Sequence, residues 1–342
     1  MTLCFALSMV LYSCGGSVFT TEVQTVAEPE ETIEITVDRV DKDHAYSEYF
    51  AIYDSLLISS RPNSTDDIFY VADIKNDTLL GSFMHRGEGP GEYLGLNPVR
   101  RIERRGNDLI ALTYDPNKYK LLEWNITQSI EAGRDSVVEL GSFETPKGFM
   151  YTDIYRIGES RFVGYTPPLG IMGGALPPAY WILDGKINIT PRSSISIFNN
   201  EREVLAGNLG SAWSLSPDNS KIVASMRCLA QINIIDLTTD TVHSYRMENS
   251  PGEEVLQLDY PDSQYSNVVC NDESIFALYL GYPAEEFRNR LGGEWLHEFG
   301  WDGTFKKKYR LPVSIRNIWM DTSSNTLYGY CEPEDAIYRL NL

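Results

Sequence analysis

Six short apolar stretches decide the fold: residues 56–60 (LLISS), 109–113 (LIALT), 162–166 (FVGYT), 222–226 (IVASM), 275–279 (IFALY) and 327–331 (LYGYC). Successive stretches begin 52 to 60 residues apart, and each follows another strand-like segment and a short polar turn. A near-constant period of this length is typical of β-proteins whose repeats are arranged radially. The sequence therefore predicts an all-β protein, a six-bladed β-propeller.

Each repeat has room for four antiparallel strands, of which these stretches are the second. The expected first strands are 49–53, 99–103, 153–157, 212–215, 267–270 and 317–320. The expected third strands are 68–72, 119–124, 179–183, 231–236, 294–299 and 336–340. The expected fourth strands are 78–83, 136–143, 189–197, 241–247 and 305–311. The sixth blade lacks a fourth strand, and the alternating residues 32–37 (TIEITV) are predicted to supply it, which closes the ring and protects an open edge.

Composition limits the partners. The formal net charge is −19 and the pI is about 4.6, whereas affinity for nucleic acid depends on lysine and arginine. Nucleic acid is therefore excluded as a partner, and the dispersed acidity indicates a solvated surface. No proline- or serine-rich linker separates the repeats, so residues 30–342 are expected to form one domain.

The first residues are typical of an export signal. Residues 3–12 are an apolar run too short to cross a bilayer, which needs about 20 residues. They are followed by 11–15 (LYSCG), which resembles a bacterial lipobox, so we expect residues 1–13 to be a signal peptide. Cys14 would then be acylated, with residues 14–29 as a tether and this lipid anchor as the only membrane contact. Cys228, Cys270 and Cys331 have no zinc-ligand spacing and are predicted to be buried.

The loop after the first blade carries a distinctive motif, HRGEGPGEY at residues 85–93. Together with the repeats and the lipobox, it resembles the TolB-like six-bladed β-propeller lipoproteins of Bacteroidetes. The matching residues are Gly87, Gly89, Pro90, Gly91, Glu92 and Tyr93. The resemblance implies the propeller fold and a location in the bacterial cell envelope, periplasmic or surface-exposed, but no chemistry. Its glycines and proline specify a tight backbone path, so we favour a structural role that locks blade one to blade two.

Strand order predicts which face binds. In four-stranded antiparallel blades, the second-to-third and the blade-to-blade loops share one face, and the long loops fall there: 84–98, 144–150, 167–178, 199–211, 248–266 and 281–293. The main long connection on the opposite face is 125–135. Recognition usually uses such loops. The ends of the second strands are expected to ring the channel mouth as a ligand site: Arg61, Tyr114, Tyr165, Arg227, Tyr279 and Tyr330.

Catalytic patterns are sparse. The four histidines, His44, His85, His243 and His297, show no metal-ligand spacing, and the serine motif G-x-S-x-G is absent. The leading hypothesis is thus non-enzymatic binding of a glycan, a peptide or an envelope partner protein, without a cofactor. The alternative is a calcium-dependent hydrolase or lyase of the six-bladed lactonase type, with Asp153, Asn267 and Asn317 as candidate ligands in the channel. A purely architectural envelope subunit is a third reading.

Overall fold

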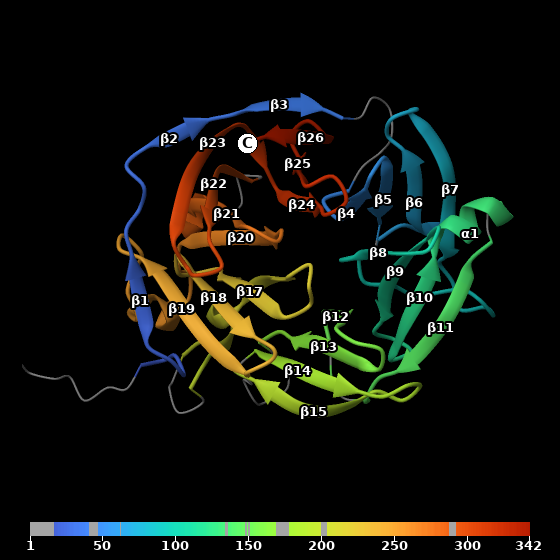
Figure 1. Ribbon diagram of the computed structural model, residues 1–342, viewed down its shortest axis with the longest axis horizontal. Coiled ribbons are helices and arrows are strands. Elements are labelled where there is room, and N and C mark those ends of the chain that lie inside the picture. The colour runs from blue at the N-terminus through green and yellow to red at the C-terminus, as the bar shows by residue number, and fades with distance from the viewer. Residues whose placement is uncertain are drawn as a thin grey trace, which may run out of the picture.

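The computed structural model describes residues 17–40, 47–61, 63–133, 136–147, 149, 151–168, 178–199, 204–286 and 292–342. Figure 1 shows six β-sheets arranged around a central axis, with the innermost strand of each sheet nearest the axis. Every sheet contains four antiparallel strands that follow one another from the axis outward, and two sheets carry an additional outer strand. The predicted six-bladed propeller is confirmed.

Each of the first three blades is formed by four strands that are consecutive in the sequence. Blade one contains β4 (Phe50–Tyr53), β5 (Leu56–Ser60), β6 (Asp67–Asp73) and β7 (Thr78–His85). Blade two contains β8 (Ile102–Arg105), β9 (Asp108–Asp115), β10 (Lys120–Asn125) and β11 (Val138–Glu144). Blade three contains β12 (Asp153–Arg156), β13 (Arg161–Thr166), β14 (Ala179–Asp184) and β15 (Thr190–Ile195).

The other three blades complete the ring. Blade four contains β16 (Ser211–Leu215), β17 (Lys221–Met226), β18 (Gln231–Asp236) and β19 (Thr241–Met247). Blade five contains β20 (Ser263–Cys270), β21 (Ile275–Tyr282), β22 (Gly293–Phe299) and β23 (Phe305–Ile315). Blade six contains β24 (Asn317–Asp321), β25 (Thr326–Cys331), β26 (Ala336–Asn341) and, from the beginning of the chain, β3 (Thr36–Arg39). All six second strands begin at or one residue before the predicted positions.

The closing strand is confirmed but shorter than expected. Strand β3 pairs antiparallel with β26, with Val37 opposite Leu340. The predicted single strand over 32–37 is interrupted at Ile35, which is buried in the apolar cluster between blades five and six. The residues before Ile35 instead form β2 (Thr32–Glu34), which pairs parallel with β23 of blade five. One alternating segment therefore joins two blades, because the side chain in its middle is buried between them.

The chain also wraps blade four. Strand β1 (Val23–Val26) pairs parallel with β19, and Phe19 forms a β-bridge with Phe198 beyond blade three. We call residues 17–34 the N-terminal belt; it runs along the outer edge in blue in Figure 1. Residues 14–29 are predicted to be a tether, whereas the described part of that range, from Ser17, lies against the propeller. Buried Val18 and Phe19 are the physical reason for this difference.

Two further local differences lie in blade two. Helix α1 (Ile126–Ala132) occupies the long connection on the opposite face, and the Asn125 side chain caps it by accepting a hydrogen bond from the Gln128 backbone N–H at 3.0 Å. The first strand begins at Ile102 rather than at residue 99. The two arginines just before it reach across the channel to blades three and four, as described below.

Among the described residues, the long-loop face carries three short 3₁₀ helices in addition to its extended loops. They are η1 (Ala206–Leu209), η2 (Glu253–Gln257) and η3 (Ala284–Glu286). Each lies in one of the loops expected on this face, and the observed antiparallel pairing of the blades places these loops on the same side. The rest of this face is formed by the beginnings of the first strands, which surround the channel.

Candidate functional site

A cavity of about 490 Å³ lies where the first strands begin, on the long-loop face. All six blades contribute to it, through Tyr49, Arg100, Asp153, Ser211, Asn267 and Asn317 at or beside the first strands. Its volume lies within the usual range for small-molecule sites, roughly 300 to 1,000 Å³. The site is therefore a product of the ring: no single blade could form it.

Both carboxylates that line the cavity are paired with arginines. Arg100 Nε lies 3.1 Å from Asp153 Oδ1, and this pair joins blade two to blade three. Arg316 Nε lies 3.2 Å from Glu48 Oε2. Burial lowers the pKa of Arg100, but the Asp153 carboxylate together with Tyr155 and Tyr49 raises it by more, so the arginine pKa lies above its usual value. Arg100 therefore remains a cation inside the channel.

A second cavity of about 480 Å³ occupies the other end of the channel. Arg100 lines both cavities, and Arg101 and Arg104 line the second. Arg101 Nη2 donates a hydrogen bond to Pro217 O at 3.0 Å, and its Nη1 reaches Ser216 O at 3.4 Å. This one side chain therefore connects blade two to blade four across the channel.

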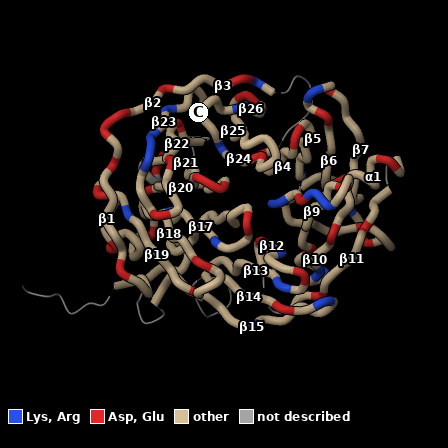
Figure 2. Tube along the Cα trace, in the orientation of Figure 1, with Lys and Arg blue, Asp and Glu red and all other residues tan. Residues whose placement is uncertain are grey.

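The channel has the opposite charge to the rest of the protein. Across the two cavities the lining includes five arginines, with three carboxylates: Arg100, Arg101, Arg104, Arg227 and Arg316, against Glu48, Glu103 and Asp153. The whole chain has a formal charge of −19. Figure 2 shows basic segments of blade two beside the central axis, while acidic segments are spread along the outer strands and the belt. An anion is thus favoured inside the channel and disfavoured elsewhere.

Tyr165 and Trp213 line one side of the cavity, and Tyr180 and Tyr155 pack against them. Tyr165 and Tyr180 direct their hydroxyl groups to the Ser211 hydroxyl, at 3.4 and 3.3 Å, and Trp213 packs edge-on against Tyr155 with ring centroids 4.7 Å apart. Burial raises the pKa of the Tyr165 hydroxyl, so it stays neutral. Within the described residues, the buried indole N–H of Trp213 has no hydrogen-bond acceptor. Tyr165 is 3% exposed and Trp213 8%, because their rings pack against one another and against their neighbours, so they leave the cavity only a small apolar surface.

Two of the six second-strand residues predicted at the mouth, Tyr165 and Arg227, line the cavity. The other four have different surroundings. Arg61 lies over the Tyr70 ring at 4.4 Å, and the Tyr114 hydroxyl lies 3.1 Å from Thr145 Oγ1. Tyr279 stacks on His297 at 4.5 Å, and the Tyr330 hydroxyl donates to Asp335 Oδ1 at 2.9 Å.

The reason is the position of the second strand within a blade. It lies one strand away from the axis, so the first strand separates most of its side chains from the channel. The residues that sequence reasoning missed, Glu48, Arg100 and Arg316, lie just before or at the first strands. Charged residues at the beginnings of predicted first strands are the signal that would have found them. Ligand binding by the six predicted residues stays a prediction.

The loop motif of residues 85–93 forms a compact turn. Glu92 Oε2 accepts a hydrogen bond from the Gly89 N–H at 2.6 Å, and a Cβ atom at Gly87 would lie 1.9 Å from the same oxygen. The Tyr93 N–H donates to His85 O at 2.9 Å, and the Tyr93 hydroxyl bonds to Glu139 of blade two. Lys118 Nζ, also in blade two, donates to Glu92 O at 2.6 Å. These contacts fit the expected role of holding blade one to blade two.

The three candidate calcium ligands already have partners or lie beside groups that do. Asp153, Asn267 and Asn317 all line the cavity, as the alternative hypothesis requires. Asp153 is ion-paired with Arg100, however, and the Asn317 side-chain oxygen accepts a hydrogen bond from the Ile318 N–H at 3.0 Å. Calcium would have to displace a guanidinium from its carboxylate, so these residues do not fit the ion. Among the described residues, no three His, Cys, Asp or Glu side chains are grouped to hold a metal.

The predicted signal peptide and Cys14 lie outside the described residues. Within the described ranges, no helix is both long and apolar enough to cross a membrane. The three downstream cysteines, Cys228, Cys270 and Cys331, are buried free thiols, as predicted. Burial raises the pKa of the Cys228 thiol to about 11 and that of Cys270 to about 12, which makes them poor nucleophiles.

No protein-family model matches this sequence, and no curated protein matches it. Solved structures do share its fold. A "Putative exported protein" from Bacteroides fragilis NCTC 9343 superposes with a TM-score of 0.54 at 12% identity, covering 94% of this chain and 99% of that one. The calcium-binding protein regucalcin from Agrobacterium tumefaciens gives a TM-score of 0.50 at 8% identity, covering 93% and 96%. Raptor from Chaetomium thermophilum gives 0.52 at 9% identity, covering 91% of this chain and 29% of that one.

These identities are low, so the similarities establish the propeller fold alone. The similar structures include a calcium-binding protein and part of a much longer chain, so the same architecture occurs in proteins of different kinds. Function has to be argued from the chemistry of the channel.

Proposed function

We propose that this protein is an exported, lipid-anchored β-propeller of the TolB-like type that binds an anionic ligand in the cavity of its long-loop face. The observation that carries this proposal is the concentration of arginines in the channel of a strongly acidic protein. Guanidinium groups pair with carboxylates through forked hydrogen bonds. The ligand class is therefore a glycan or a peptide that carries carboxylates, presented either free or on an envelope partner protein.

Arg227 is the residue best placed to meet such a ligand first. Its side chain is exposed at the cavity, while its backbone is held by hydrogen bonds to Gly210 O at 3.1 Å and from the Gln264 N–H at 2.7 Å. A rigid backbone limits the conformational freedom that the side chain loses on binding. Tyr165 and Trp213 would contact the uncharged part of the ligand through the small apolar surface that they leave open to the cavity.

The export and anchoring parts of the proposal are supported by the apolar residues 3–12 and the lipobox-like residues 11–15. The fold shared with an exported Bacteroides protein is consistent with the same compartment. For the calcium-dependent enzyme, the arginine partners of both cavity carboxylates argue against the required ion site.

Calorimetric titration of the purified protein tests the ligand class. The anionic probes are trigalacturonic acid and a glutamate-rich tetrapeptide, and the neutral counterparts are maltotriose and the glutamine version of the peptide. At least one anionic probe is expected to bind. Arg227→Gln should weaken its binding by roughly 10- to 150-fold, because losing a hydrogen bond to a charged group costs roughly 1.5 to 3 kcal/mol.

Arg192→Gln is the matched control, since Arg192 is exposed on the outer strand β15 and pairs with Asp184 at 3.5 Å. Its affinity should equal that of the wild type. Equal binding of anionic and neutral probes would refute the ligand class. An anionic probe whose affinity is unaffected by Arg227→Gln would refute this cavity as its site.

A further inference from the structure

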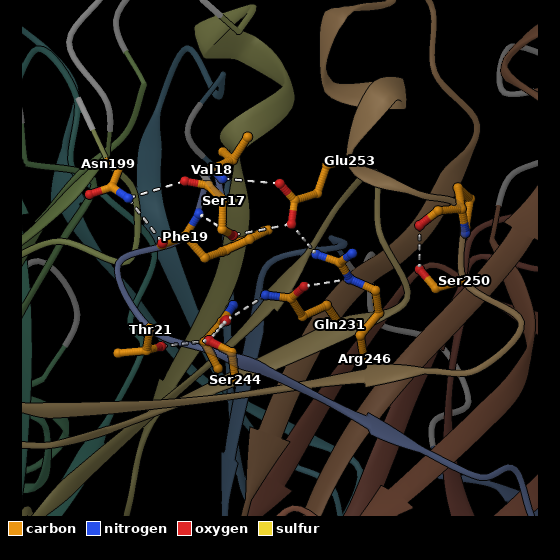
Figure 3. Close-up of polar contacts among 12 residues, drawn as sticks. Ser17, Val18, Phe19, Thr21, Asn199, Gln231, Ser244, Arg246, Ser250 and Glu253 are labelled. Atoms are coloured by element: carbon orange, nitrogen blue, oxygen red, sulfur yellow. Dashed lines mark hydrogen bonds and ion pairs between the residues drawn. The ribbon is translucent and has the colours of Figure 1, made fainter. Parts of the chain in front are cut away.

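The N-terminal belt begins on the long-loop face, between blades three and four. Val18 N–H donates to Glu253 Oε2 at 3.0 Å, and Glu253 begins η2. The Asn199 side-chain amide donates to Ser17 O and to Phe19 O, both at 3.1 Å. Figure 3 shows Ser17, Val18 and Phe19 held between Asn199 and Glu253. Both partners belong to blade-to-blade loops, which emerge on this face.

A polar network in blade four fixes this starting point. Arg246 Nη2 lies 3.4 Å from Glu253 Oε1, and Arg246 Nε donates to Gln231 Oε1 at 2.8 Å (Figure 3). The same guanidinium lies over the Phe19 ring at 5.2 Å. Ser17 therefore occupies a defined position on the propeller.

Three exposed apolar side chains lie on the loops beside this point. Leu205 is 43% exposed, Leu258 50% and Tyr260 85%, and we call these three residues the apolar rim. The loops that carry them are joined by hydrogen bonds, because the Leu205 N–H donates to Leu256 O at 3.1 Å and the Asn208 amide donates to Leu258 O at 2.7 Å. Leu256 also packs in one cluster with Val18 and Phe19 of the belt.

The short length of chain between Cys14 and Ser17 limits how far an acylated Cys14 could lie from this rim. Cys14 lies three residues before Ser17, so an extended chain places it at most about 11 Å away. We propose that the apolar rim rests in the headgroup layer of the membrane that holds the acyl chains of Cys14. The inference rests on the anchoring part of the proposed function. The propeller then stands with its long-loop face, and the mouth of its cavity, turned toward the bilayer.

The charges around the rim predict how this contact behaves. Glu254, Asp259 and Asp262 surround Leu258 and Tyr260 in the sequence, so anionic lipid does not attract this surface. The contact depends on the acyl anchor and on apolar insertion to a depth of about 5 to 10 Å. It should therefore persist at high salt, unlike a contact made by basic residues.

Single-cysteine labelling of the full acylated protein in vesicles tests this orientation. The vesicles contain phosphatidylethanolamine and phosphatidylglycerol, and the label is NBD at Tyr260→Cys or, on the opposite face, at Ile187→Cys. Ile187 is 68% exposed, and the native Cys228, Cys270 and Cys331 are buried, so labelling is selective. Dithionite should reduce the label at position 260 roughly fivefold more slowly in the vesicle-bound protein than in the unanchored Cys14→Ser protein in solution. The rate of reduction at position 187 should be the same in both samples.

Mass spectrometry of the amino terminus separates the two proposals. Unmodified Cys14 would overturn both the anchor and the orientation. Acylated Cys14 with equal dithionite access at both positions would overturn the orientation alone. The Cys14→Ser protein without vesicles provides a further test. If its label at position 260 is protected from dithionite and sedimentation gives a dimeric mass, a second copy of the chain covers the rim and the proposal is overturned. As a second support, Leu205→Ser combined with Leu258→Ser should restore access at position 260 while acylation and near-UV circular dichroism stay unchanged.

Discussion

Replacement of Phe19 by alanine should measure how firmly the N-terminal belt is part of the propeller. Phe19 is only 2% exposed, packs against Phe198 with ring centroids 5.6 Å apart, and has Arg246 over its face. Truncating a buried phenylalanine costs about 3 to 5 kcal/mol. The belt strands pair only with the outermost strands β19 and β23, so we expect the belt to detach before the blades unfold. Its docking free energy then limits the loss, and we expect about 3 kcal/mol, at the lower end of that range.

Urea unfolding followed by tryptophan fluorescence provides the measurement, with the loss taken from the shift in midpoint at a common slope. Gln24→Ala is the matched control, because Gln24 is exposed on β1 and should change the unfolding free energy by less than about 0.5 kcal/mol. Phe19→Ala should also speed amide exchange in Val23–Val26, which pairs with β19. If Phe19→Ala unfolds within about 0.5 kcal/mol of the wild type, residues 17–26 are a tether after all.

Three other outcomes are expected. Burial, followed by repulsion from Lys308, lowers the pKa of the fully buried His297 to about 3. Below about pH 6.5 the folded protein therefore binds fewer protons than the unfolded chain, and its stability falls by up to about 1.4 kcal/mol per pH unit. Urea unfolding at several pH values should show a flatter dependence of stability on pH for His297→Gln, and parallel profiles for the variant and the wild type would contradict this. Glu92→Ala should cost about 1.5 kcal/mol, because it removes the hydrogen bond that the Glu92 carboxylate accepts from the Gly89 N–H. Glu88→Ala, at the exposed neighbour, should be neutral in the same assay, and equal effects of the two substitutions would contradict a structural role of the loop. Calcium should change the melting temperature by less than about 1 °C, because an ion that does not bind the folded state cannot stabilise it. A rise of several degrees with calcium that is absent with magnesium would instead support the calcium-dependent enzyme.

The sequence by itself determined the number of blades, their four-strand order and the closing strand. These features depend on apolar alternation and turns between neighbours in the chain, which are local and repeat six times. Residues 32–37 were recognisable as a strand on the same basis. Their division between two blades was not, because it depends on the burial of Ile35 against residues far away in the sequence.

Only the tertiary structure decided which side chains meet in the channel. Arg100 pairs with Asp153 and Arg101 reaches Pro217, and neither contact leaves a periodic signal in the sequence. Second-strand ends looked equivalent by repeat position, yet Tyr165 and Arg227 line the cavity while Tyr114 and Tyr330 do not. The belt is a similar case, since Phe19 meets Phe198 only after blades three and four have come together. Local pattern specifies a blade, whereas the site depends on the ring that six blades form.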